Sequence, residues 1–572
     1  MKPLSPMRAK LLLFLAPFAG ACAAQSPHES APRFEWFHYE GADAVHDAPL
    51  GEDEYRNPVL SGFYPDPSVT RAGDDYYLVT STFAYFPGLP VFKSRDLVSW
   101  TQIGNVIDRR GMLDFKNLGL SGGVFAPTIE YHDGVFYVAN TCVDCGGNFI
   151  VTATDPAGPW SDPVWLPEVG GIDPSLFFDG DGKVYLMNND APPQAARYDG
   201  HRAIWIREID PLTFQSVSAP VVLIDGGVRP EEKPIWIEGP HIYKVGDWYY
   251  LSAAEGGTAV NHSQVVLRAR SVLGPYEPYQ GNPILTQRDL AEGRPDPVTS
   301  VGHADLVTDD EGNWWATFLG VRPYEGDFYN TGRETFLAPV VWKDGWPIIA
   351  TPGAPIPYAA KRPSAPKVEA PAVPMSGGFS VHEEFDAPLA PYWLTVRDPG
   401  DAWATIEGGA VKLRPQADGL GDFGRPAMLA RRQQHLKAAA STAVSFAPAA
   451  PGDEAGLAAF QNDEYHYALG VTLGDDGARM VRLRRRAGPD DPADGVVIAS
   501  AALDGPAGAE IRLRIRADGA AYGFDYAEAP GDWRTLLDGA DGRILSTRTA
   551  GGFVGAVFGM YAAAGAAPVQ AD

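Results

Sequence analysis

Aromatic and aliphatic residues recur in short runs along the first part of this chain of 572 residues. Five of these runs share one layout, in which a polar turn pair precedes a run of strand-forming, mostly aromatic residues. They are GDDYYLV from Gly73, DGVFYVA from Asp133, DGKVYLM from Asp181, GDWYYLS from Gly246 and EGNWWAT from Glu311. Successive runs lie about 50 to 65 residues apart, a period typical of propellers and arrays. Because each propeller blade is one four-stranded sheet, the pattern predicts five blades.

The hydrophobic pattern also divides the chain into segments. We expect a leader at residues 24–55 and a propeller at 56–355, followed by a Pro/Ala-rich linker at 356–380 that is extended and semi-rigid. Residues 381–572 instead alternate apolar and polar positions, most clearly at 511–516, where Ile and Leu alternate with Arg. A sheet with one buried and one solvent-exposed face is typical of a β-sandwich. The predicted fold is therefore all-β, a five-bladed β-propeller followed by a C-terminal β-sandwich.

The charge balance restricts the partners. The chain has 46 Lys and Arg against 72 Asp and Glu, a net charge of −26, and no basic stripe, which argues against a nucleic-acid partner. An acidic, soluble chain of this kind suits neutral ligands. Its 14 Trp and 24 Tyr suit the stacking of flat rings on sugars, although aromatic residues also build all-β cores.

The first residues have the pattern of an export signal. A basic start precedes an apolar run at residues 11–21 that is too short to span a bilayer, and small residues follow it. We therefore expect a signal peptide at residues 1–23 and a periplasmic or secreted protein. The sequence Ala-Gly-Ala before Cys22 leaves two outcomes open, a lipid on Cys22 or release by cleavage after Ala23. A lipid on Cys22 would be the only membrane contact that we expect.

The remaining cysteines, Cys142 and Cys145, have C-x-x-C spacing. In an exported protein this spacing favours a local disulfide, with a reduced pair as the alternative. A structural zinc site would need two more ligands, and the sequence has no second cysteine pair.

The candidate chemistry lies eleven or twelve residues before the centre of each aromatic run. The five residues found there are Asp66, Ala126, Asp173, Glu238 and His303. Equivalent positions on the innermost strands of a propeller face one central volume. Three crowded carboxyls spread their pKa values, which acid–base hydrolysis requires. A single Asp-Pro or Gly-Pro pair would be interpreted as a turn, but five in phase favour a site.

These motifs together resemble glycoside hydrolase family 43, which contains β-xylosidases and α-L-arabinofuranosidases. The similar segments are GFYPDPSV, STFAYFPGLPVFKSRDL, GGVFAPTIEYHDGVFYV, GGIDPSLFFDGDGKVYL, IEGPHIYK and GHADLV. The C-terminal region resembles the concanavalin-like jelly roll that accompanies the two-domain xylosidases of the family. The resemblance extends over about nine tenths of the chain that follows the signal peptide.

The resemblance implies an inverting mechanism with three catalytic acids. Asp66 matches the general base, Glu238 the general acid, and Asp173 the residue that tunes and orients the acid. An inverting pair needs roughly 6.5–9.5 Å between base and acid, to leave room for a water molecule. Opposite sides of a propeller channel can supply that gap.

Other positions match substrate-binding residues of the family. Phe83 and Phe125 match aromatic walls of the sugar pocket, although many members have Trp where this chain has Phe125. Arg333 matches an arginine that binds sugar hydroxyls near the base, and a surface arginine is the alternative interpretation. His303 matches a channel histidine. No cofactor is implied as required. A calcium ion in the channel stays open, and since calcium prefers oxygen ligands, His303 would then act through water.

The family's sandwich usually ends in a strand similar to ADFDWF, which this sequence does not show before Asp572. The segment Phe34-Glu35-Trp36-Phe37 near the N-terminus resembles that strand. We therefore hypothesise that residues 33–41 pair with the sandwich edge and tie the two domains together. The alternative is a loose leader with a clipped C-terminus.

Taken together, the sequence predicts an exo-acting glycosidase that removes terminal pentoses from xylan-derived oligosaccharides, most simply a β-1,4-xylosidase. An α-L-arabinofuranosidase or bifunctional enzyme is the alternative, because loop shapes select the sugar. A non-catalytic carbohydrate-binding propeller is more distant, since all three acids are present. The sandwich alone could also serve as a binding module for polymer.

Overall fold

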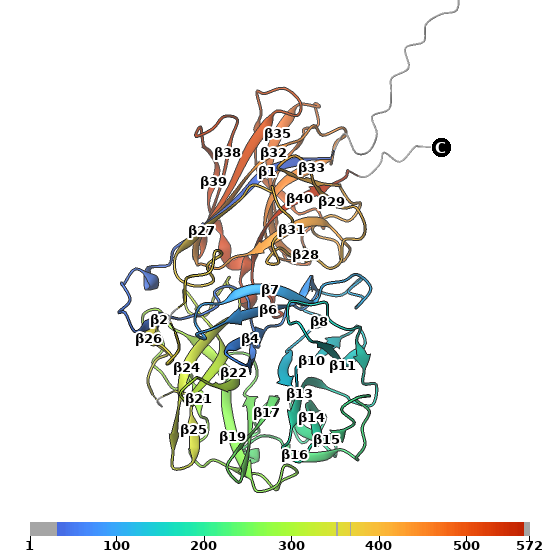
Figure 1. The fold of residues 1–572 in the computed structure, drawn as a ribbon. Helices are drawn as coiled ribbons and strands as arrows, with labels where there is room; N and C mark the ends of the chain where they lie inside the picture. The colour runs from blue at the N-terminus through green and yellow to red at the C-terminus, as the bar shows by residue number, and fades with distance from the viewer. Residues whose placement is uncertain (1–30, 351–352, 367, 566–572) are drawn as a thin grey trace, which may run out of the picture.

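A computed structural model describes residues 31–350, 353–366 and 368–565 of the chain. The predicted signal peptide and Cys22 lie outside these ranges. The described residues form a propeller, drawn in the lower part of Figure 1, and a sandwich above it. None of their helices reaches the length and hydropathy needed to cross a bilayer. The all-β prediction is confirmed, since the helices within these ranges are confined to η1 (Ala44–His46), η2 (Pro230–Glu232), η3 (Gly542–Leu545) and α1 (Thr547–Ala550).

Five antiparallel sheets form the propeller, and each predicted aromatic run is the second strand of its blade. Blade 1 comprises β3 (Ser68–Ala72), β4 (Asp75–Val79), β6 (Gly88–Ser94) and β7 (Thr101–Ile107). Blade 2 comprises β8 (Gly123–Val124), β9 (Thr128–His132), β10 (Val135–Val143), β11 (Gly147–Ala153) and β12 (Val164–Trp165). Blade 3 comprises β13 (Ile172–Phe178), β14 (Val184–Asp190), β15 (Ala203–Ile209) and β16 (Val221–Asp225). Blade 4 comprises β17 (Glu238–Val245), β18 (Trp248–Glu255), β19 (Ser263–Ala269), β20 (Glu277–Pro278) and β21 (Leu285–Thr286). Blade 5 comprises β22 (Thr299–Thr308), β23 (Trp314–Val321), β24 (Glu334–Lys343) and β25 (Trp346–Ile348).

The turn before each second strand contains a glycine in the left-handed region, as at Gly73 and Gly134, where φ is 65° and 86°. Glycine adopts this conformation without a Cβ clash, so these turns can return the chain from the innermost strand to the second one. The polar turn pairs seen in the sequence are therefore the hairpins at the inner edge of each blade.

The innermost strands β3, β9, β13, β17 and β22 contact one another in a closed ring. Side-chain hydrogen bonds link every neighbouring pair of blades. They run from Ser68 to Asp305, from the Ile129 amide to Ser68, from Thr128 to the Pro174 carbonyl, from Ser175 to the Pro240 carbonyl and from Tyr243 to Asp305. This ring fixes the positions of the strand ends, where the site residues lie.

Two further sheets form the sandwich. One has the order β29-β30-β1-β32-β37-β38-β39, with β27 also paired to β1, and the other the order β31-β40-β33-β34-β35-β36. The bounds are β1 (Arg33–Gly41), β27 (Phe379–Glu383), β29 (Ala404–Ile406), β30 (Val411–Leu413), β32 (Lys437–Ser445), β37 (Glu510–Asp518), β38 (Ala521–Ala527) and β39 (Arg534–Asp541) for the first sheet. The second sheet comprises β31 (Ala427–Arg432), β33 (Glu454–Asn462), β34 (Tyr465–Leu473), β35 (Arg479–Ala487), β36 (Val496–Ala502) and β40 (Val557–Ala563).

The alternation predicted at residues 511–516 matches the structure. Ile511, Leu513 and Ile515 are fully buried between the two sheets. Arg514 and Arg516, on the other face, both pair with Asp525 of the neighbouring strand. Period-two alternation therefore identified the inner face correctly.

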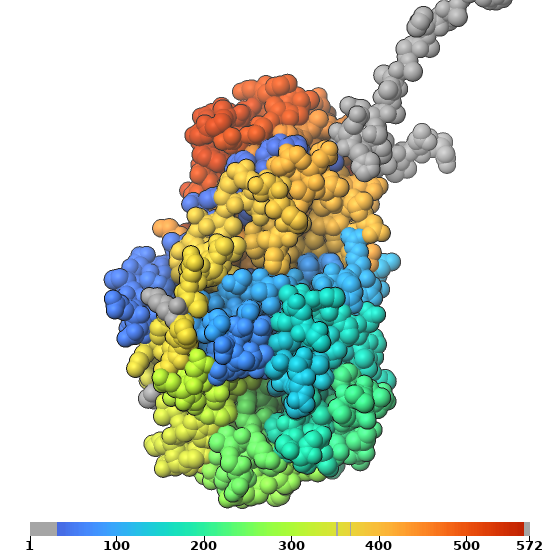
Figure 2. All heavy atoms as spheres, in the orientation of Figure 1, coloured from blue at the N-terminus to red at the C-terminus, as the bar shows by residue number. Residues whose placement is uncertain are grey.

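The N-terminal strand β1 belongs to the sandwich, as the resemblance of residues 33–41 to a sandwich strand suggested. It pairs along its whole length with β32, and on its other side with β27 and β30. The expected position at the sheet edge is wrong, because strands flank β1 on both sides. Figure 2 shows this blue segment among the orange and yellow surface of the sandwich. The leader thus closes a sheet made otherwise of residues beyond 378.

Several contacts join the sandwich to the propeller. Strand β5 (Tyr85–Phe86) of the propeller pairs with β28 (Thr395–Val396). The following residue, Arg397, donates to the Leu118 carbonyl of the propeller and to the Asp463 carboxylate of the sandwich. Part of the predicted linker also adds a strand to the propeller side, β26 (Ala359–Lys361), which pairs with β2 (Glu54–Arg56). The linker is therefore held against the propeller at this point.

The local disulfide expected from the C-x-x-C spacing is present. Cys142 and Cys145 are bonded at a Cα–Cα distance of 5.1 Å. The bond closes the turn between β10 and β11 of the second blade.

Candidate active site

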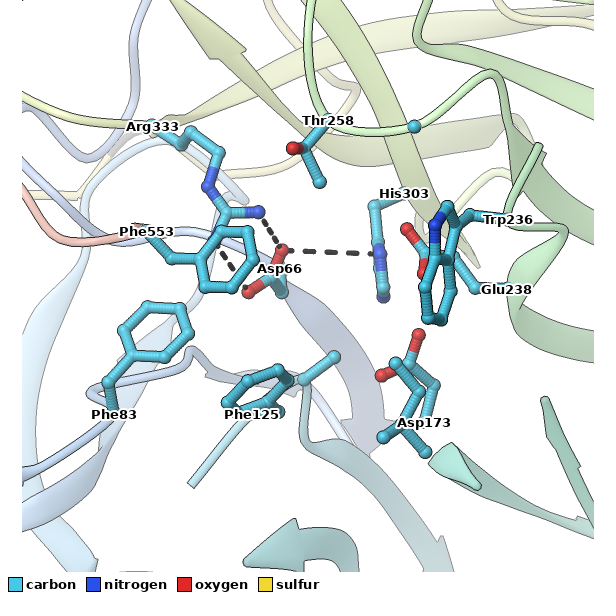
Figure 3. A pocket seen from close by; sticks show the side chains of 13 residues that line it. Asp66, Phe83, Phe125, Asp173, Trp236, Glu238, Thr258, His303, Arg333 and Phe553 are labelled. Atoms are coloured by element: carbon cyan, nitrogen blue, oxygen red, sulfur yellow. Dashed lines mark hydrogen bonds and ion pairs between the residues drawn. The ribbon is translucent and has the colours of Figure 1, made fainter. Parts of the chain in front are cut away.

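A cavity of about 250 Å³ opens at the centre of the propeller. All five residues at equivalent positions in the repeats line it: Asp66, Ala126, Asp173, Glu238 and His303. Phe83, Phe125 and Arg333 line it too, so the cavity gathers every site residue expected from the sequence (Figure 3). Ala126 lacks a polar group, so blade 2 contributes no acid or base to the cavity and lines it with Phe125 and Ala126.

The backbone is irregular where these side chains enter the cavity. Asp66, Asp173 and His303 have φ values of 54°, 54° and 53°, in the left-handed region that most residues avoid. Strand pairing also shifts register after Ile172 and after Glu238. Such conformations cost about 1–3 kcal/mol each and persist only where the surrounding structure enforces them. Here the kinks turn strand ends so that their side chains point into the channel.

Gly239 shows how tightly this region is packed. Its φ is 55°, and a Cβ at this position would lie 2.8 Å from Nε2 of His303. Both the left-handed backbone and the nearby imidazole therefore require glycine directly after Glu238.

Asp66 is 5 % exposed and surrounded by donors. Nη1 and Nη2 of Arg333 donate to its two oxygens at 2.8 and 3.4 Å, and the Ser81 hydroxyl donates to Oδ2. Burial alone would raise the pKa of Asp66, but Arg333, His303 and Ser81 more than offset it, so the pKa lies below its ordinary value. Asp66 is therefore ionised at neutral pH.

Asp173 and Glu238 have the opposite electrostatic environment. Burial, followed by the negative charge of Asp66, raises the pKa of Asp173 to about 7. Burial, Asp173 and Asp66 raise the pKa of Glu238 well above its ordinary value. Like charges in a site of low dielectric cannot all ionise. The site therefore combines Asp66, whose pKa is lowered, with Asp173 and Glu238, whose pKa values are raised.

Three phenylalanines form one wall of the cavity. The ring of Phe553 stacks on Phe83 at a centroid distance of 5.7 Å, and Phe125 meets both rings edge-on. Phe553 belongs to the sandwich, and its amide donates to the Ser121 hydroxyl of the propeller. Sequence reasoning missed Phe553, because nothing in the pattern of a sandwich indicates which loop reaches another domain.

The wall on the Glu238 side was also missed. The cavity is also lined by Ile172, Trp236, Gly257 and Thr258, and Figure 3 draws Trp236 beside Glu238. The guanidinium of Arg202 sits 4.0 Å from the Trp236 ring centroid, a cation–π distance that holds the indole in place. Trp236 lies directly before the motif IEGPHIYK, two residues before Glu238, and this position was the available signal.

His303 lies between Asp66 and the other two acids in Figure 3. Its Nδ1 is 4.0 Å from Oδ1 of Asp66, and burial lowers its pKa to about 4, so the imidazole is neutral at pH 7. Ligand atoms of Asp173, Glu238 and His303 lie within 4.8 Å of one another.

These three side chains do not fit a calcium ion well. Calcium takes six to eight oxygen ligands, whereas this group offers one nitrogen and two carboxyls, both with a raised pKa. The donor set suits proton transfer better than calcium.

The domains match known proteins in the order seen along the chain. The family model for glycosyl hydrolases family 43 matches residues 55–347. The model for the beta-xylosidase C-terminal concanavalin A-like domain matches residues 382–572.

Proteins similar to this chain are named as xylosidases, as arabinofuranosidases or as both. A xylosidase/arabinosidase of Butyrivibrio fibrisolvens is 38% identical over 88% of this chain and 95% of its own length. A non-reducing end alpha-L-arabinofuranosidase of Bacteroides ovatus is 38% identical over 90% and 92%. A beta-xylosidase of Bacillus subtilis is 32% identical over 88% and 95%.

Solved structures show the same two-domain arrangement. A GH43_12 protein from a capybara gut metagenome superposes with a TM-score of 0.87 at 38% identity, over 93% of this chain and 99% of that one. A GH43B protein of Bacteroides ovatus superposes with a TM-score of 0.80 at 37% identity, over 89% and 96%.

Proposed function

Since this chain belongs to glycosyl hydrolase family 43 and is a glycoside hydrolase of the xylosidase/arabinosidase type, we propose that it is an inverting exo-glycosidase. Its substrates would be xylan-derived oligosaccharides, from which it removes the terminal pentose, and β-1,4-xylosidase is the activity that we propose first. The observation that carries the proposal is the placement of three buried acids around one small cavity, where Arg333 bonds to Asp66 and lowers its pKa while the pKa of Glu238 is raised.

In this mechanism Asp66 acts as the general base. Its carboxylate, held by Arg333 and Ser81, accepts a proton from a water molecule that attacks the anomeric carbon. Glu238, on the opposite side of the sugar, donates its proton to the leaving oxygen as the glycosidic bond breaks. The anomeric configuration inverts, because the water attacks the face opposite the leaving group.

Asp173 supports the acid in two ways. Its Oδ2 accepts a hydrogen bond from the Gly239 amide at 3.1 Å, and its proximity raises the pKa of Glu238. A general acid works best when it still holds its proton at the working pH. Asp173 therefore keeps Glu238 protonated and fixes the backbone beside it.

The size of the cavity favours an exo mode of action. Its volume of about 250 Å³ is below the usual 300–1,000 Å³ of ligand pockets. Phe553 from the sandwich and Trp236 from the propeller wall it on two sides. A pocket of this kind accepts the end of a sugar chain and excludes a chain that continues on both sides of the cleaved bond.

The choice of sugar is the finer part of the proposal. Both pentoses present hydroxyls to Arg333 and an apolar face to Phe83 and Phe125, so one pocket can accept both. The arabinofuranosidase of Bacteroides ovatus favours the second candidate, an α-L-arabinofuranosidase or bifunctional enzyme.

The decisive experiment compares 4-nitrophenyl β-D-xyloside with 4-nitrophenyl α-L-arabinofuranoside, using the wild type and Glu238→Ala. We expect cleavage by the wild type and a loss of at least about a hundredfold in kcat in the variant, because general acids contribute about 10²–10⁴. The ratio of kcat/KM values identifies the preferred sugar, and NMR of the first-formed anomer tests inversion. Equal rates for the two proteins, also on the phenyl pentoside, whose leaving group needs a proton, would refute the role of Glu238.

We also propose that the protein is exported, from the signal-like residues 1–23. Fractionation of the native host would place it in the periplasm, the medium or the membrane. A shift to the soluble fraction in Cys22→Ser would indicate a lipid on Cys22, and cytoplasmic retention of the full chain would refute export.

A further inference from the structure

The strand that carries Glu238 is not held by regular pairing at its beginning. In the β17–β18 ladder, Glu238 pairs with Ala254, and the next partners are His241 and Ser252. The register shift between them takes the main chain of residues 239–240 out of the ladder. Other groups must therefore satisfy and orient this backbone.

Three side chains of blade 3 do so. Nδ2 of Asn189 donates to the Ile237 carbonyl at 2.5 Å, Oδ2 of Asp173 accepts from the Gly239 amide at 3.1 Å, and the Ser175 hydroxyl donates to the Pro240 carbonyl. The peptide groups on both sides of Glu238 are thus bonded to side chains from the neighbouring blade, in addition to the pairing of Glu238 with Ala254 in its own sheet.

Asn189 has no direct place in the chemistry. It lies on β14 opposite Ile172, is 1 % exposed and does not line the cavity. A buried amide costs free energy unless it is hydrogen-bonded. Its bond goes to the carbonyl directly before Glu238, where a change in the peptide plane rotates the Cα–Cβ bond of the general acid.

We propose that Asn189 is a positioning residue, which holds the Glu238 carboxyl in line with the leaving oxygen through the Ile237 carbonyl. This inference rests on the proposed role of Glu238 as the general acid. It assigns part of the alignment of the acid to a side chain that never touches the sugar. A displacement of about 1 Å in a catalytic group can cost on the order of a hundredfold in rate.

The test uses a series of substituted phenyl glycosides of the preferred pentose, from 2,4-dinitrophenyl to phenyl. Dinitrophenolate leaves without a proton, whereas phenolate needs one, so only the poorer leaving groups report on the acid. We expect Asn189→Leu, which has a similar volume, to lower kcat for the phenyl glycoside at least about tenfold and for the dinitrophenyl glycoside less than about threefold. The plot of log kcat against leaving-group pKa becomes steeper.

Two references make the result specific. Glu238→Ala gives the slope of log kcat against leaving-group pKa in the absence of the acid. Gln287→Leu removes another buried amide, which donates to the Ala354 carbonyl at 3.0 Å and lies outside the cavity. Gln287→Leu is expected to lower Tm and leave the slope unchanged. If Asn189→Leu does not fold, Asn189→Ser replaces it, because the shorter serine side chain removes the amide that donates to the Ile237 carbonyl.

An equal loss for all leaving groups, or no loss for any, in a folded Asn189 variant would overturn the inference. A wild-type slope that Glu238→Ala does not change would instead overturn the role of Glu238, and with it the premise. The two failures are therefore distinguishable in one set of measurements.

Discussion

At the scale of single residues, one arginine decides how the buried acids divide their charge. Asp66, Asp173 and Glu238 are all nearly inaccessible to solvent, and burial raises the pKa of each. Arg333 contacts only Asp66 among them, at 2.8 Å, and lowers the pKa of that carboxyl most. Because Arg333 contacts only one of the three buried acids, its charge separates the pKa of Asp66 from those of Asp173 and Glu238.

The pH profile tests this. In Arg333→Met the effect of burial on Asp66 is no longer offset, so the pKa of Asp66 rises and the acidic limb of kcat/KM moves to higher pH. The basic limb moves in the same direction, because Arg333 also lowers the pKa of Glu238. Arg202→Met is the matched control: Arg202 lowers the pKa of Glu238 and is not among the groups that act on Asp66, so only the basic limb should move. An acidic limb that stays in place in Arg333→Met would contradict this account.

Asp173 gives a stability prediction with a defined sign. Its folded pKa of about 7 lies above the ordinary value of 3.8. The folded protein is therefore most stable with respect to this group below pH 3.8, where Asp173 is protonated in both states. Stability falls as the pH rises from 3.8 toward 7, because the unfolded chain loses this proton more readily than the folded protein. Asp173→Asn removes this loss. We expect a Tm at least about 2 °C above that of the wild type at pH 8, and little difference at pH 4. The measurement is thermal unfolding at both pH values, and a lower Tm at pH 8 would contradict it.

At the scale of elements, strand β1 connects the beginning of the chain to the last domain. It inserts between β32 and the pair β27 and β30, so its loss leaves two unpaired edges inside one sheet. Phe37 of β1 is 2 % exposed and packs edge-on against Trp393 at 5.1 Å. The sandwich therefore depends on residues that lie more than three hundred positions away in the sequence.

Phe37→Ala should cost about 3–5 kcal/mol of unfolding free energy, because it leaves a cavity in the sandwich core. Trp36→Ala changes the neighbouring side chain, which is half-buried on the opposite face, and should cost clearly less. Denaturant unfolding followed by fluorescence compares the two. Similar losses for both variants would show that β1 is not packed as described.

The sequence predicted part of this element and not the rest. The resemblance of Phe34-Glu35-Trp36-Phe37 to the last sandwich strand of the family identified the partner domain, because a short strand motif is a local feature of the sequence. It placed the strand at an edge, and the structure places it inside. Strand order depends on long-range pairing, which a local pattern does not encode.

At the scale of the whole molecule, the sandwich completes the active site. Phe553 stacks on Phe83, and the guanidinium of Arg333 lies 5.4 Å from the Phe553 ring. The interface also includes the strand pair β5–β28 and the buried Arg397–Asp463 ion pair. The position of one pocket wall is therefore fixed by the packing of two domains.

Phe553→Ala should lower kcat/KM for the preferred pentoside roughly 10- to 100-fold, because burying such a ring contributes about 1.5–3 kcal/mol. Phe423→Ala is the control, since Phe423 is in the same domain, is 48% exposed and does not line the cavity. Steady-state kinetics compares both with the wild type. Unchanged kcat/KM in Phe553→Ala would exclude a role for the sandwich in the pocket.

The sequence by itself determined the all-β class, the five repeats and the set of residues that meet at the centre of the propeller. It could do so because hairpins, alternation and repeat phase are local properties, and because rotation about one axis makes equivalent positions converge. Only the tertiary structure decided that Arg333 acts on Asp66, that Trp236 and Phe553 wall the cavity, that Asn189 holds the backbone before Glu238 and that β1 lies inside a sheet. Each of these depends on contacts between segments distant in the chain, whose geometry exists only once the blades and the two domains have packed together.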